Sequence, residues 1–243
     1  MSKLILLRHG QSQWNLEDRF TGWVDVDLTA EGEAQATKGG ELIRAEGLAI
    51  DRCYTSVQTR AIRTSWLALA AAGQAFVPET KDWRLNERHY GGLTGLNKTE
   101  TAAKHGADQV TIWRRSYDVP PPPLPPGGEF DFSKDRRYAG AVLPNTESLK
   151  MTLERVQPYW EAEIAPHLAL GETLLVAAHG NSLRAIVKLL FGLSADEIVH
   201  VEIPTGNPLL IDLDADLKPV SSRYLDAARA SKLPVHASGP PPR

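Results

Sequence analysis

Leu4-Ile5-Leu6-Leu7-Arg8-His9-Gly10-Gln11-Ser12 is the stretch of this sequence that decides the fold. Four apolar residues in a row predict a short strand buried on both faces, as in a parallel sheet. Ligands of open α/β sheets bind just beyond the carboxyl ends of the strands, which is where Arg8 and His9 are expected. Arg8 suits phosphate or carboxylate, and a neutral His9 can serve as nucleophile, base or ligand. Gly10 is expected to turn the backbone and to leave its N–H free for an anion.

On this stretch alone, a strand end with two solvated polar residues is the simpler interpretation. A second stretch, Thr173 to Ser182, repeats the design: an apolar run ends in His179-Gly180 and is followed by small polar residues and a helical pattern. Two strands that both end in His-Gly can lie side by side in one sheet, with their imidazoles facing one pocket. The repetition therefore favours a functional site.

The composition is that of a globular protein, with 42% hydrophobic and 23% charged residues in a chain of 243. The length favours a single α/β domain. A formal net charge of −3 argues against nucleic-acid or membrane binding through the overall field, so an anion must be bound locally by a few arginines. The single cysteine, Cys53, excludes an intrachain disulfide. With no secretory pattern and no apolar run of transmembrane length, we expect a cytoplasmic protein.

The rest of the chain alternates between helix and strand patterns. Helices are expected over residues 29–47, 59–72, a stretch through Trp113, 146–160, 183–191 and from a capping box at 194–197. Further strands are expected over residues 50–56, 76–78, 199–203, 209–214 and 219–224. Gly39-Gly40 weakens the first helix and Pro158 is expected to disturb the fourth. Arg60 lies on the first turn of its helix, where a cation is disfavoured unless an anion is bound there.

Residues 6–12 resemble the signature of the histidine phosphatase superfamily. Their continuation, Trp14-Asn15 and Arg19-Phe20-Thr21-Gly22-Trp23, is similar to the cofactor-dependent phosphoglycerate mutases within it, as is Leu85-Asn86-Glu87-Arg88-His89-Tyr90-Gly91. The resemblance extends over residues 3 to 225. It implies a three-layer αβα sandwich around a mostly parallel sheet, with one catalytic domain over residues 1–228. Residues 229–243 are expected to form a flexible tail that closes over the site.

The resemblance also implies what each site residue does. His9 is the nucleophile that carries a phosphoryl group, and Glu87 is the general acid and base. Arg8 and Arg60 bind the phosphate. Beyond the resemblance, His179, if protonated, would add a positive donor that strengthens as negative charge develops. The other expected substrate contacts are Gln11, Ser12, Asn15, Thr21, Gly22, Arg88, His89, Tyr90, Lys98, Arg114, Arg115, Gly180 and Asn181.

The implied reaction is the interconversion of 3-phosphoglycerate and 2-phosphoglycerate, in glycolysis and gluconeogenesis, with 2,3-bisphosphoglycerate as the priming phosphoryl donor. No histidine pair has metal-ligand spacing, so no metal is expected. Two alternatives stay open. One is a phosphatase of the same superfamily that acts on a small phosphorylated metabolite, although Lys98 and Arg114-Arg115 favour the mutase. The other is a non-catalytic module that binds a phosphorylated ligand.

Residues 119–128 carry six prolines and two glycines, a composition that excludes helix and interior strand. We interpret this run as a surface loop or active-site flap within one domain, because the sheet pattern resumes after it. Oligomeric state cannot be read from these residues. The family resemblance implies a homodimer, or a tetramer built from dimers.

Overall fold

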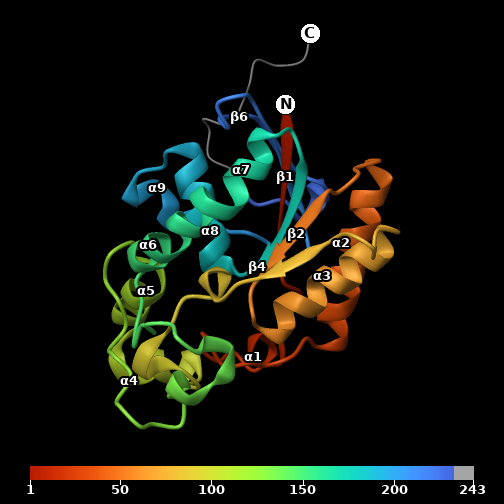
Figure 1. Cartoon of the computed structure of the whole chain (residues 1–243). Coiled ribbons are helices and arrows are strands. Elements are labelled where there is room, and N and C mark those ends of the chain that lie inside the picture. Colours follow the sequence, from red (N-terminus) through yellow and green to blue (C-terminus); the bar gives the residue numbers. More distant parts are fainter. Residues whose placement is uncertain (233–243) are drawn as a thin grey trace.

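The computed structural model describes residues 1–232 and has a six-stranded sheet at its centre (Figure 1). The strands are β1 (Ser2–Arg8), β2 (Arg52–Thr55), β3 (Glu79–Lys81), β4 (Thr173–Ala178), β5 (Leu209–Leu213) and β6 (Pro219–Tyr224). Their order is β3-β2-β4-β1-β5-β6. The first four in this order are parallel, and β5 pairs antiparallel with both of its neighbours. The prediction of a mostly parallel sheet is confirmed.

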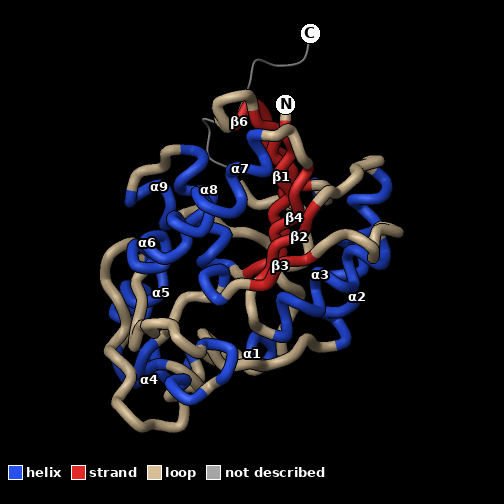
Figure 2. The backbone as a smooth tube through the Cα atoms, viewed as in Figure 1, coloured by secondary structure: helices blue, strands red, loops and turns tan. Residues whose placement is uncertain are grey.

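Helices cover both faces of the sheet (Figure 2). They are α1 (Gln13–Leu16), α2 (Ala30–Ala45), α3 (Thr59–Ala71), α4 (Lys98–His105), α5 (Ala107–Arg115), α6 (Leu149–Tyr159), α7 (Ala165–Ala169), α8 (Gly180–Phe191) and α9 (Ala195–Val199). α2 and α3 pack on one face, and α6 to α9 lie on the other. This is the expected three-layer sandwich. No helix within residues 1–232 is long and apolar enough to cross a lipid bilayer.

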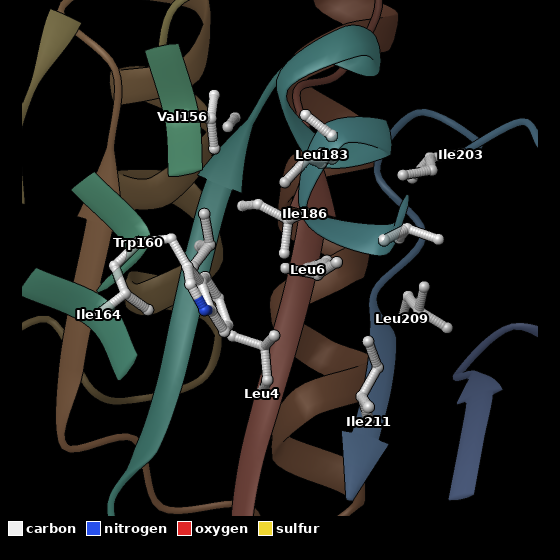
Figure 3. Packing of buried hydrophobic residues seen from close by; sticks show 14 of the residues in the cluster. Leu4, Leu6, Val156, Trp160, Ile164, Leu183, Ile186, Ile203, Leu209 and Ile211 are labelled. Carbon is white, nitrogen blue, oxygen red and sulfur yellow. The ribbon is translucent and has the colours of Figure 1, made fainter. Parts of the chain in front are cut away.

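The strand β1 shows why its apolar run is continuous. Alternate residues of a strand point to opposite faces, so Leu4 and Leu6 enter one hydrophobic cluster while Ile5 and Leu7 enter the other. All four side chains are fully buried. In Figure 3, Leu4 and Leu6 lie among side chains of the helical layer, including Trp160, Leu183 and Ile186. A strand in the middle of a sandwich has no solvent face, and its sequence therefore shows no polar alternation.

Two glycines of the first helical layer are explained by close backbone contacts rather than by flexibility. A Cβ atom at Gly40 of α2 would lie 2.1 Å from the carbonyl oxygen of Ala68 in α3. A Cβ atom at Gly10 would lie 2.0 Å from the carbonyl oxygen of Gly32. Gly39-Gly40, which we expected to weaken the helix, instead lies inside a continuous α2 and lets α3 approach it.

Two of the predicted strands are wrong. Residues 199–203 do not pair in the sheet: α9 ends at Val199, and Val201 and Ile203 are buried as part of an irregular segment. Their alternating apolar pattern reflects packing on the core. The strand expected at residues 76–78 forms three positions later, as β3, and Val77 is buried ahead of it.

Pro158 lies inside a helix without ending it, although proline often breaks a helix. α6 continues through it, a π-helical turn at Trp160–Ile164 follows, and α7 completes the same rod. The π turn comes just after Pro158 has removed one backbone N–H from the ladder.

The chain makes a long excursion beyond the carboxyl ends of the strands, where α1, α4 and α5 lie (Figure 1). Its proline-rich segment forms neither helix nor strand, as predicted. It is tied to the loop after Glu87, because the Gly92 N–H donates to the carbonyl oxygen of Pro122 at 2.7 Å. Most of the expected tail, residues 229–243, lies outside the described residues. Within them, the Ser231 hydroxyl donates to the hydroxyl oxygen of Tyr224 at 3.1 Å.

Candidate active site

The two His-Gly corners meet at one point of the sheet edge. β1 and β4 are adjacent and parallel, with Arg8 opposite Ala178, so His9 and His179 follow neighbouring strands. The backbone N–H of His9 donates to the carbonyl oxygen of Ala178 at 2.9 Å. The two imidazole centroids lie 5.0 Å apart with their planes at 62°. Both side chains are buried, and the predicted pairing of the two strands is confirmed.

Hydrogen bonding assigns the proton on His9. Its Nδ1 lies 2.7 Å from the carbonyl oxygen of Gly10. Because a carbonyl oxygen only accepts, Nδ1 carries the proton and Nε2 keeps a free lone pair. The Gly10 N–H donates to Thr64 Oγ1 at 3.2 Å. The expectation that this N–H is free for an anion is therefore wrong.

The surroundings of both imidazoles favour their neutral form. Burial, followed by the positive charges of Arg60 and Arg8, holds the pKa of His9 well below its usual range. Burial, followed by Arg60 and His9, does the same to the pKa of His179. The environment of His179 carries an excess of positive charge, which disfavours its protonated form in the ligand-free site. A protonated His179 stays a prediction for the site with a phosphoryl group bound. Nε2 of His179 lies 2.8 Å from Ser56 Oγ, while its buried Nδ1 has no partner within residues 1–232.

Two arginines stand beside the imidazoles. Arg60, on the first turn of α3, is almost fully buried and donates to the carbonyl oxygens of Val24 and Gly22 at 2.9 and 2.8 Å. Burial lowers its pKa to about 10, which leaves it charged at neutral pH. Arg8 donates to the carbonyl oxygen of Ile203 at 2.9 Å. The Nε atoms of both arginines are buried without a partner in the described part of the chain, and this suits an anion binding between them.

Glu87 is held with one oxygen tied down. Its Oε1 accepts the N–H of Arg88 at 2.7 Å, the N–H of Asn181 at 3.1 Å and the side-chain amide of Asn181 at 2.8 Å. The backbone of Glu87 is also fixed, because its N–H donates to Gln58 and its carbonyl oxygen accepts the Trp23 indole N–H at 2.6 Å. The carboxylate is therefore placed firmly before any ligand binds.

Two small cavities share Arg8, Glu87, Tyr90 and Arg114 in their walls. The first, of about 150 Å³, is further lined by His9, Asn15, Arg19, Phe20, Thr21, Gly22, Arg60 and Lys98. The second, of about 130 Å³, is further lined by Arg115, Gly180, Asn181, Arg184, Val201, Glu202 and Ile203. Most of the predicted site residues therefore surround one space rich in positive charge.

Five predicted site residues lie outside these cavity walls, and one of them is His179, whose ring lies next to that of His9. The Gln11 side chain accepts the Thr29 hydroxyl at 2.9 Å, and the Ser12 hydroxyl caps α1. Arg88 is fully buried, with its guanidinium 4.7 Å from the Tyr90 ring centroid and one bond to the backbone of Arg114. These side chains support the walls of the site.

His89 lies in a third cavity, of about 420 Å³, formed with the proline-rich segment. Burial lowers the pKa of His89 to about 4, and its Nδ1 accepts the Gly91 N–H at 3.0 Å. It stands behind Glu87 rather than in the two cavities around it.

Comparison with known proteins agrees with this geometry. A sequence model of the histidine phosphatase superfamily (branch 1) matches residues 4–222. A 2,3-bisphosphoglycerate-dependent phosphoglycerate mutase of Caulobacter sp. (strain K31) is 79% identical and covers 97% of this chain and 99% of its own. The mutase of Hyphomonas neptunium is 64% identical, over 96% and 99%. The chain belongs to the phosphoglycerate mutases of the histidine phosphatase superfamily.

Solved structures share the fold of this phosphoglycerate mutase family member. A mycobacterial glucosyl-3-phosphoglycerate phosphatase matches with a TM-score of 0.69 at 21% identity, covering 92% of this chain and 97% of its own. The alpha-ribazole phosphatase of Shigella flexneri matches with a TM-score of 0.67 at 21% identity, over 96% and 100%. At this identity the likeness concerns the fold alone.

Several residues that shape the phosphoglycerate mutase site were missed from the sequence. Arg184 lies on α8, three positions after Asn181, a helical spacing that places both on one side and could have identified it. Arg155 and Glu147 form a buried ion pair whose arginine also donates to the backbone carbonyls of Arg84, Asn86 and Glu87. No local pattern identifies that pair, because its partners come from distant segments. Within residues 1–232, His, Cys, Asp and Glu form no group of three able to hold a metal ion.

Proposed function

We propose that this chain interconverts 3-phosphoglycerate and 2-phosphoglycerate through a phosphohistidine at His9. The observation that carries this proposal is the state of His9, a buried neutral imidazole with Nδ1–H bound to Gly10 and a free Nε2. An unprotonated nitrogen on a fixed ring can attack phosphorus without first losing a proton. The surrounding Arg8 and Arg60 supply the charge that phosphoryl transfer needs.

The transferring phosphoryl group has three oxygens, and the chain offers donors with free capacity for them. These are the guanidinium groups of Arg8 and Arg60, Nδ1 of His179 and the N–H at the start of α8, Gly180. The amino terminus of this helix adds a partial positive charge. A bound dianion would also raise the proton affinity of His179, so that its Nδ1 becomes a donor as the anion binds.

Glu87 is proposed to move the substrate proton. When the substrate hydroxyl attacks the phosphorus of phospho-His9, an O–P bond forms and the P–N bond breaks, with its electron pair returning to Nε2. The hydroxyl proton passes to Glu87. In the return step Glu87 gives that proton to the departing oxygen while the other phosphoryl group goes to His9.

The cations on the far side of the cavities favour a mutase over a hydrolase. Lys98, Arg114 and Arg115 line them and suit the carboxylate and second phosphate of a phosphoglycerate. Asn15, Thr21, Gly22, Tyr90 and Asn181 complete the proposed contacts. Gln11, Ser12, Arg88 and His89 are proposed to act by holding these groups in place. Water would then have few approaches to phospho-His9.

2,3-bisphosphoglycerate is the proposed priming donor, and it supplies the phosphoryl group that loads His9. The two adjoining cavities and the unpartnered guanidinium nitrogens fit a ligand with two phosphates. Because Arg8 and Arg60 already supply positive charge where a metal ion would otherwise act, we propose that no metal is needed.

We further propose a cytoplasmic homo-oligomer with no membrane or nucleic-acid partner. Trp66 is 57% exposed and Phe76 is 82% exposed, and both flank the edge strand β3. A second copy packed on this edge would cover them. Light scattering coupled to size exclusion should give more than one chain per particle, and Phe76→Asp should shift it toward the monomer. A monomeric unmodified chain would refute this part of the proposal.

The decisive experiment is turnover of 3-phosphoglycerate with and without 2,3-bisphosphoglycerate while free phosphate is followed. A mutase makes 2-phosphoglycerate at a rate that depends on the bisphosphate and survives EDTA. A phosphatase of the same superfamily instead releases phosphate in proportion to substrate consumed. Release of phosphate without formation of 2-phosphoglycerate would show that the chain is a phosphatase and not a mutase.

A further inference from the structure

The general acid and base of the proposed reaction has two unequal oxygens. Oε1 of Glu87 accepts three N–H groups, two of them from Asn181. Oε2 faces the space between the cavities: a Cβ atom at Gly180 would lie 3.7 Å from it and 3.5 Å from Nε of Arg8. An oxygen that accepts three N–H bonds has little room for a proton. Oε2 of Glu87 is thus the oxygen that can exchange a proton with the substrate.

We propose that Arg184 is a positioning residue that acts through Asn181 to keep Glu87 in this arrangement. The inference rests on the proposed function of Glu87 and adds a residue to it. Arg184 Nη1 donates to Asn181 Oδ1 at 3.0 Å, and Nη2 donates to the carbonyl oxygen of Ile198 at 2.6 Å. The side chain is 6% exposed, and its Nε has no partner in the described part of the chain.

The chemistry of the guanidinium decides the orientation of the Asn181 amide. The two ends of an amide are nearly equal in size, so their neighbours decide which way it points. A guanidinium has donors only, so Oδ1 must face Arg184. The NH₂ end of the amide then faces Glu87, where it donates at 2.8 Å to Oε1. Without Arg184 the amide can turn over and place Oδ1 against Oε1, which is favourable only when that oxygen carries a proton.

Arg184 is itself held firmly enough to serve this purpose. It is anchored from α9 through Ile198, whose helix begins with a capping box at Ser194 and Glu197. Burial, followed by the charges of Arg88 and Arg115, lowers the pKa of Arg184 to about 10, so it stays charged at neutral pH. A buried cation beside other cations lowers stability unless its hydrogen bonds compensate for the loss of water. The contacts here run from α9 through Arg184 and Asn181 to the proton-transfer group.

The test compares Arg184→Met and Asn181→Ala, alone and combined, in the full chain. We expect Arg184→Met to lower kcat by about 10- to 100-fold with little change in KM. We also expect the acid limb of the kcat/KM profile to move to higher pH, because Glu87 loses a donor that favours its charged form. In the Asn181→Ala background, adding Arg184→Met should lower kcat little further, since the connection from Arg184 through Asn181 to Glu87 is already lost.

Lys188→Met is the matched control. Lys188 is also on α8, and in the described part of the chain it donates to the carbonyl oxygen of Leu193 and contacts Tyr117. It should leave kcat and the pH profile unchanged. If Arg184→Met does not fold, Arg184→Lys replaces it in the same comparison with Asn181→Ala, and we expect kcat to fall about fivefold. An unshifted pH profile, or equal losses in both backgrounds, would overturn the proposal. Absence of mutase turnover in the unmodified chain would instead refute the proposed function.

Discussion

At the scale of single residues, the proposed chemistry depends on which nitrogen of His9 carries a proton. The Gly10 carbonyl oxygen fixes the proton on Nδ1, and burial beside Arg60 and Arg8 keeps the ring neutral. The same positive surroundings keep His179 neutral until an anion arrives. The site therefore supports two different roles for its imidazoles. His9 is the neutral nucleophile, and His179 gains a proton when the ligand binds.

Replacing His9 tests the nucleophile directly. His9→Ala should incorporate no phosphoryl group from labelled 2,3-bisphosphoglycerate, because it removes the imidazole that lines that cavity in the described part of the chain. The unmodified chain should form a phosphoenzyme that is labile in acid and stable in base. We expect kcat to fall by about four orders of magnitude. The exposed His105→Ala is the control and should label normally, whereas label retained in His9→Ala would exclude His9 as the nucleophile.

The residue types of the site could be predicted from the sequence, but their protonation could not. His9 and His179 were recognisable because each ends an apolar run, and parallel strands bring such ends together. Burial, followed by the charge of Arg60, lowers the pKa of His179, and neither cause is local in sequence. Arg155 and Glu147 were missed for the same reason, since their partners are distant segments of chain.

At the scale of elements, close packing decides whether α2 forms, and it outweighs helix propensity. Gly40 lies in the interior of α2, where glycine costs about 1 kcal/mol relative to alanine. The contact with Ala68 leaves no room for a methyl group. The same principle explains the failed strand at residues 199–203, where burial on the core produced an alternating pattern without pairing. Local patterns predict periodicity, but not which partner an element packs against.

Gly40→Ala therefore separates propensity from packing. Propensity alone predicts a gain in stability, while the 2.1 Å contact predicts a loss, because α2 must move away from α3. We expect a net loss in the free energy of unfolding of about 2 kcal/mol, measured by urea denaturation. Lys38→Ala, at an exposed position of the same helix, should change stability by less than about 0.5 kcal/mol. A stabilised Gly40→Ala would show that the helices are free to separate.

At the scale of the whole molecule, the site makes folding sensitive to pH. His9, His89 and His179 are neutral when folded, because burial and nearby cations hold each pKa below 6.5. In the unfolded chain these histidines take up protons as the pH falls through about 6.5. The unfolded state then binds more protons, so stability must decrease as the pH falls. The burial and nearby positive charge that keep His9 neutral thus lower the stability of the whole fold in acid.

Between pH 7.5 and 5.5 each of the three histidines should remove about 1.4 kcal/mol from the free energy of unfolding, for a total of roughly 4 kcal/mol. Urea midpoints at the two pH values measure this loss. Sulfate keeps its double negative charge over this range and should bind between Arg8, Arg60 and the imidazoles. By raising the proton affinity of His179 it should stabilise the chain more at pH 5.5 than at pH 7.5.

Two variants separate the site from the rest of the molecule. His179→Asn should lessen the loss of stability in acid and the pH dependence of the sulfate effect, while His105→Gln, at an exposed position, should leave both unchanged. Equal sulfate stabilisation at both pH values would mean that anion binding and proton uptake are independent. The positive charge of the site would then come from its arginines alone, and His179 would not gain a proton as the anion binds.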